Sequence, residues 1–163
     1  STSSGRECVS IAKMSQRLQG AGIEAAKVTE LIRDIGNVAA ATGDLSEERL
    51  NGIGKAFGDV ATNQRVLGEE MNQLAERGIP AWKILAQQMG VTVAEARKMG
   101  EQGKITSKIF FDAFQQFSRA NFGDAMQKQA ATFTGAMNVI TNIAQVTAEK
   151  AFRPIFEKIS TFG

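Results

Sequence analysis

Two glutamate pairs and one Arg-Lys pair are the side chains of this sequence best placed to do chemistry. The glutamate pairs stand at 47–48 and 69–70, and the basic pair stands at 97–98. Paired carboxylates can act as general acid and base, and clustered basic side chains can neutralise nucleic-acid phosphates. Both glutamate pairs, however, fall in the first turn of an expected helix, where negative charge complements the helix dipole. The sequence therefore favours a structural role for these carboxylates.

Most of the other groups that enzymes use are missing from the sequence. It has no histidine, no tyrosine and one cysteine, Cys8. Zinc sites built from His and Cys, His general bases and Ser-His or Cys-His nucleophile pairs therefore lack their parts. Cys8 shares helical spacing with Ile11 and Ala12, which favours a small core residue. The sequence predicts a protein that is not an enzyme and has no cofactor, metal or small-molecule substrate.

The composition is that of an ordinary folded chain. Of its 163 residues, 43% are hydrophobic and 22% are charged, enough for one domain or two small ones. The formal net charge is only +2, so no strong field recruits nucleic acid or an anionic membrane. The sequence starts at Ser1 and has neither a signal sequence nor a run of about 18 apolar residues. We expect a soluble excerpt of a longer polypeptide.

Apolar side chains recur at helical spacing along the chain, and nothing alternates as in a strand. Two of the runs are Val28, Leu31, Ile32, Ile35 and Phe110, Ala113, Phe114, Phe117. The pattern predicts an all-α, compact bundle of seven or eight short helices that ends in a longer C-terminal helix. The stretches 31–40 and 53–62 echo each other, and we interpret them as two amphipathic helices packed as a hairpin, because a solenoid would need at least three copies.

Glycine and proline mark the expected helix boundaries. Gly78 should end one helix and Pro80 should open the next, which makes Gly78, Ile79 and Pro80 a tight corner. Gly90 and Gly103 should end two further helices.

Caps and acidic first turns mark the helix starts. Ser46 is an expected cap, Thr92 and Glu95 form a capping box, and Thr106 or Ser107 should start another helix.

Trp82 follows the predicted corner directly. Its spacing with Leu85 and Met89 predicts a largely buried core residue. A nucleic-acid stacking platform would need basic neighbours, and only Lys83 is near in sequence.

The segment 129–148 contains no charged residue and carries apolar residues on two faces. We expect a helical domain over 1–123, followed by an exit helix over 124–163 that leads to the rest of the parent chain. One face holds Val139, Ile143 and Val146. It is a candidate surface for self-association or a partner, and packing within the domain's own core is an equally open alternative.

The stretch 84–105, "ILAQQMGVTVAEARKMGEQGKI", is spaced like a helix-turn-helix DNA-binding module. Its second helix offers Glu95, Arg97 and Lys98, with Glu101 just beyond. The two basic side chains are offset by two acidic ones, so this helix offers little net positive charge for binding DNA phosphates. We therefore expect no sequence-specific nucleic-acid binding, and keep a DNA-binding module as the alternative function.

A wider segment, 65–106, closely resembles the N-terminal domain of tail tape measure proteins of long-tailed bacteriophages and prophages. The most specific landmarks are "GIP" at 78–80 and "GKI" at 103–105 with their spacing. Other pieces follow in the family's order, namely "AAATGDL" at 39–45, "FFDAF" at 110–114 and "KQAATFTGAMNVI" at 128–140. The resemblance covers about residues 12–155. Asp44 replaces the second glycine of the family's TGG turn.

The resemblance implies a virion structural protein that occupies the lumen of the growing tail tube and sets the length of the tube. It implies partners among other copies of the chain, the tail tube and tail assembly chaperones. It places the protein in the bacterial host cytoplasm during assembly and then in the virion tail. The length-setting part itself would lie outside these residues.

Overall fold

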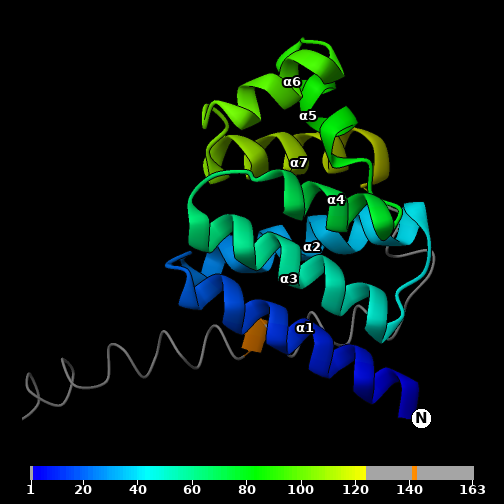
Figure 1. Ribbon diagram of the computed structural model, residues 1–163. Helices are drawn as coiled ribbons and strands as arrows, with labels where there is room; N and C mark the ends of the chain where they lie inside the picture. Colours follow the sequence, from blue (N-terminus) through cyan, green and yellow to red (C-terminus); the bar gives the residue numbers. More distant parts are fainter. Residues whose placement is uncertain (1, 124–140, 143–163) are drawn as a thin grey trace, which may run out of the picture.

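The computed structural model describes residues 2–123 and 141–142, with side chains from Val9 onward. Within that part of the chain it contains seven helices and no strand (Figure 1). The helices are α1 (Thr2–Gly20), α2 (Ala25–Thr42), α3 (Glu47–Asn63), α4 (Gly68–Glu76), α5 (Ala81–Met89), α6 (Val93–Glu101) and α7 (Ser107–Phe122). The all-α class and the helix number predicted from apolar spacing are confirmed.

Side-chain caps start three of these helices where the sequence places them. Ser46 accepts a hydrogen bond from the backbone N–H of Arg49, and Thr106 accepts one from Ile109. Thr92 accepts from the N–H of Glu95 at 3.1 Å, so the predicted N-cap is confirmed, and its hydroxyl donates to the Glu95 carboxylate at 3.1 Å in place of the backbone N–H of a full capping box. Each cap satisfies a backbone donor that would otherwise lack a partner.

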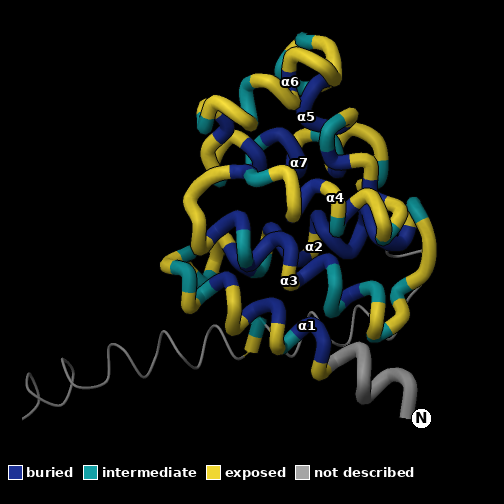
Figure 2. The backbone as a smooth tube through the Cα atoms, viewed as in Figure 1, coloured by how far each residue is buried: buried dark blue, intermediate teal, exposed yellow. Residues whose placement is uncertain are grey.

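The core is one cluster of buried apolar side chains that draws on every helix except α6. Phe57 of α3 lies near its centre, with its ring centroid 4.8 Å from that of Phe114 and 5.2 Å from that of Phe110. Phe111 stacks on the same ring at 5.8 Å. Three aromatic residues of α7 therefore surround a single residue of α3. Figure 2 shows the buried residues along the inner faces of the helices.

The predicted hairpin of α2 against α3 is wrong. The helix that packs most extensively on α3 is α1, whereas α2 packs on α7 and α1. Two glycines let α1 and α3 approach closely: a Cβ at Gly54 would lie 3.0 Å from Met14, and one at Gly58 would lie 3.3 Å from Arg17. The apolar faces of α2 and α3 thus meet a shared core rather than each other. Sequence similarity between two helices does not reveal their packing partners.

Figure 1 places α6 at one end of the bundle, beyond α5. Ala96 is its one buried residue, and most of the helix is exposed (Figure 2). α6 packs mainly against α5, which in turn packs against α7. The pair α5–α6 therefore projects from the body of the bundle.

Candidate functional site

The predicted corner at 78–80 lies between α4 and α5. Gly78 adopts a positive φ of 81°, a conformation that suits glycine, and its N–H donates to the carbonyl of Ala75. The Ile79 N–H donates to the Leu74 carbonyl at 2.9 Å, which completes a Schellman motif. Ile79 is fully buried. Pro80 occupies the N-cap position of α5 rather than its first turn, because Ala81 is the first helical residue.

Gly90 and Gly103 lie where the sequence places them. Gly90 is the C-cap of α5, with a φ of 69°, and Gly103 has a φ of 71° just after α6. Each therefore follows the end of a helix in the left-handed conformation that suits glycine.

A second feature at the 78–80 corner is a half-buried arginine. Arg49 of α3 donates to the carbonyl of Arg77 at 2.7 Å, to the carbonyl of Asp44 at 2.8 Å and to the hydroxyl of Thr42 at 2.7 Å. It also donates to the carbonyl of Ala39. One guanidinium thus satisfies carbonyls at the ends of both α2 and α4. Burial lowers the pKa of Arg49 from its ordinary value, yet leaves it cationic at neutral pH.

Asp44, which replaces a glycine of the family's turn, also has a local role. Its Oδ1 accepts from the N–H of Ser46 at 3.2 Å and from the Ser46 hydroxyl at 2.8 Å. These hydrogen bonds lower the pKa of Asp44 below its ordinary value. The substitution therefore supports the turn before α3.

The structure corrects one expectation for Trp82. The side chain is partly buried and packs against the core, which agrees with the predicted core position. It also has basic neighbours other than Lys83, because Arg65 and Arg97 line the same surface hollow of about 280 Å³. Gly100 makes room for the indole: a Cβ there would lie 2.6 Å from Cη2 of Trp82. The sequence alone did not reveal these neighbours, because Arg65, Trp82 and Arg97 lie in three separate parts of the chain.

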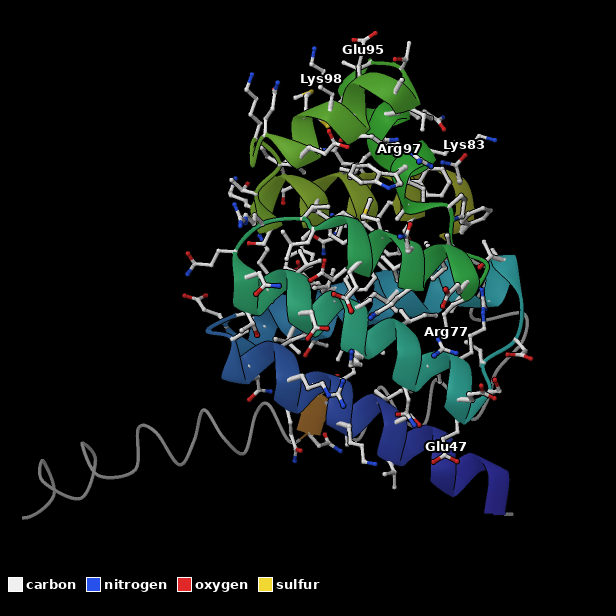
Figure 3. All side chains as sticks on the ribbon, viewed as in Figure 1. Glu47, Arg77, Lys83, Glu95, Arg97 and Lys98 are labelled. Carbon is white, nitrogen blue, oxygen red and sulfur yellow. The ribbon has the colours of Figure 1, made fainter. Side chains whose placement is uncertain are left out.

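The stretch 84–105 does form two helices joined by a short turn, α5 and α6. Figure 3 shows that Lys98 and Glu95 of α6 point away from the bundle, whereas Arg97 lies back toward α5. The three side chains therefore do not form one basic face. A helix that reads the major groove needs several such groups directed at bases and phosphates. This arrangement does not favour the DNA-binding alternative.

The glutamate pairs lie in the first turns of α3 and α4, as expected. Glu70, however, is buried, and its Oε1 accepts from the side-chain amide of Asn63 at 2.9 Å. Glu48 is highly exposed and lies 3.8 Å from Arg77. Glu70 thus links α4 to the end of α3, in addition to placing negative charge at the start of the α4 dipole.

A buried carboxylate, Asp34, connects α2 to α7. Its Oδ2 accepts from Gln115 at 3.1 Å and lies 3.6 Å from Arg119, and Ser118 donates to its backbone carbonyl. Burial raises the pKa of Asp34 above its ordinary value, although Arg119 opposes that shift.

Another hollow, of about 610 Å³, lies where the end of α1 and the start of α2 meet the start of α7. Its apolar wall includes Ile23, Leu31 and Phe111. Lys27 and Lys108 line it too, and both contact Asp112 of α7, at 3.9 and 3.4 Å. Its basic groups are therefore already paired.

Among the described residues, no group of three or more Cys, Asp or Glu side chains is arranged to hold a metal ion. No described helix is long and apolar enough to cross a membrane. Val139, Ile143 and Val146 of the candidate association face lie outside the described residues, as does the side chain of Cys8.

The family model of tape measure proteins matches residues 1–151. No curated protein and no solved structure matches the chain significantly. Because the match covers most of the sequence, the chain belongs to the tape measure protein family. It is thus a structural protein of a phage tail, consistent with the helical fold of the residues that the structure describes.

The site residues that sequence reasoning missed are Arg49, Arg65 and Asp34. Arg49 and Asp34 are charged residues within helices, and an exposed position is the usual expectation for such residues. Glycines offered the one usable signal: Gly43, Gly52 and Gly100 each lie against an arginine or Trp82 side chain. A glycine inside a helical pattern can therefore indicate that a large side chain from elsewhere in the fold packs against the helix at that position.

Proposed function

We propose that this domain is a folded module of a tape measure protein, the protein that sets the length of the tail tube and occupies its lumen during assembly. The family match over residues 1–151 carries the proposal. The longest described helix, α1, has 19 residues and spans about 28 Å at 1.5 Å per residue. A bundle of such helices adds little length, so we assign the length-setting role to other parts of a longer chain.

The proposed partners are other copies of the chain, the tail tube and a tail assembly chaperone. The family supports phage tail components as partners in general. The face with Val139, Ile143 and Val146 remains our proposed contact for self-association. In this proposal the protein is made in the host cytoplasm and is then incorporated into the tail.

Tail length in electron micrographs tests the length-setting role. In-frame deletions in the parent gene, outside the codons of this domain, should shorten tails by about 1.5 Å per residue removed. Restoring the lost residues with an unrelated helical sequence should restore the length. Tails of unchanged length after such deletions would contradict the proposal.

Light scattering of the 163-residue chain tests the association face. Ile143→Asp should reduce the mass to that of a monomer, because a charge cannot be buried unpaired at an apolar interface. Asn142→Asp is the matched control, since Asn142 is exposed and should tolerate the change. A wild-type chain that is monomeric at high concentration would rule out this face as a self-association surface.

A further inference from the structure

Four chain segments meet at the hollow that contains Trp82. Arg65 and Leu67 come from the link between α3 and α4, Gly68 and Asn72 from α4, Trp82 from α5, and Arg97, Gly100 and Glu101 from α6. At about 280 Å³ the hollow is slightly smaller than the usual range for drug-sized ligands, which begins near 300 Å³. Its size therefore suits a single side chain better than a cofactor.

The chemistry of the lining favours a negatively charged group. Arg65 and Arg97 line the same hollow, and among the described residues neither of them forms an ion pair, whereas Arg77 and Arg119 do. Planar guanidinium groups bind carboxylates through two parallel hydrogen bonds. The amide of Asn72 can add a further donor, and the indole of Trp82 provides an apolar wall.

Gly100 makes room for the indole that lines the hollow, because a Cβ there would lie 2.6 Å from Cη2 of Trp82. Leu67, at the N-cap position of α4, has no side chain that could accept a hydrogen bond from the first backbone N–H groups of that helix. Leu67 and Gly68 line the hollow, so this helix start lies beside it.

We propose that this hollow binds one carboxylate side chain of an acidic protein segment. Glu101 also lines the hollow, so the two arginines and this glutamate leave one net positive charge, which a single carboxylate would balance. The repeated phosphates of a nucleic acid would be repelled by Glu101. The exposed face of α6 likewise mixes acids and bases. The site goes beyond the length-setting role and does not depend on it.

The single tryptophan of the chain, Trp82, is a built-in reporter. The 163-residue protein is titrated at low salt with an acetylated Glu-rich peptide and with the same peptide carrying Gln in place of Glu, by fluorescence and calorimetry. A single-stranded oligonucleotide is the third probe. We expect the Glu-rich peptide to change Trp emission and release heat with a dissociation constant in the millimolar range or below. The Gln peptide should bind at least tenfold more weakly.

Arginine variants locate the binding. Arg97→Met and Arg65→Met should each weaken binding at least tenfold, with helical circular dichroism unchanged. Lys98→Met is the matched control, because Lys98 is adjacent in sequence but points away from the bundle (Figure 3) and does not line the hollow, and it should bind as the wild type does. Equal binding of the Gln peptide, equal losses in Lys98→Met and Arg97→Met, or tighter binding of the oligonucleotide through the arginines would each overturn the proposal. Absence of any heat up to millimolar Glu peptide would do so as well.

Discussion

Arg49 is the residue whose loss should disturb the most backbone contacts at once. Arg49→Met keeps much of the apolar stem but removes donors to carbonyls of α2 and α4 and to the Thr42 hydroxyl. We expect the free energy of unfolding, measured with urea, to fall by about 2–4 kcal/mol, because part-buried carbonyls are left without donors. Lys55→Met is the control: Lys55 lies on the same helix in an exposed pair with Asp59, and such pairs contribute about 0.5 kcal/mol. Equal effects of both variants would show that Arg49 does not join the helix ends.

Gly100 should reverse the usual effect of a helical Gly→Ala change. Such changes commonly stabilise a helix by about 0.5–1 kcal/mol. At Gly100 the new methyl group would meet Trp82, so the indole must move outward. We expect Gly100→Ala to shift Trp emission to longer wavelength and to bring no gain in stability. Gly68→Ala, where no atom lies within 4 Å of the new Cβ, should leave the emission unchanged.

Asp34 should make the bundle less stable as pH rises. Its folded-state pKa is raised by burial above the ordinary 3.8, so the folded protein binds more protons than the unfolded chain between those two values. The free energy of unfolding therefore falls as pH rises through that interval. Asp34→Asn should remove this loss and be at least as stable as the wild type at neutral pH. Urea midpoints measured from about pH 3 to pH 7 give the pH dependence of stability for the wild type and for Asp34→Asn.

Asp44 provides the opposite case. Its pKa is lowered by hydrogen bonds from Ser46, so its contribution is present at neutral pH and is lost as pH falls through the lowered pKa. Asp44→Asn should therefore reduce the fall in the free energy of unfolding at acidic pH. Asp34→Asn should not reduce this fall. If both variants changed the pH profile in the same direction, this description of the two carboxylates would be wrong.

At the scale of helices, the contact between α3 and α7 should contribute most per residue. Phe57→Ala empties the space that three rings of α7 surround, and we expect a loss of about 3–5 kcal/mol. Phe122→Ala is the control, because Phe122 is only partly buried and contacts Phe117 at 5.5 Å. Its loss should be about 1 kcal/mol. Comparable losses would mean that the core does not centre on Phe57.

Helix boundaries were largely predictable because their signals are local. Caps such as Ser46 and Thr92 and the glycines at 78 and 90 act within a few residues of where they stand. Packing partners were not predictable, because an apolar stripe specifies burial but not the neighbouring helix. The wrong α2–α3 hairpin and the hidden arginines beside Trp82 have this same cause. Arg65 and Arg97 lie 32 positions apart in sequence, yet they line one hollow.

At the scale of the whole molecule, we expect this domain to act as a folded module that does not itself set the length of the tail tube. The turn between α5 and α6 lies at the projecting end of the bundle, so it can accept inserted residues without disturbing the core (Figure 1). The direct test inserts a short helical hairpin at Val91 in the parent gene and measures tail lengths by electron microscopy. We expect tails of wild-type length. Tails lengthened by about 1.5 Å for each inserted residue would contradict it, because the domain would then itself be measuring the tube.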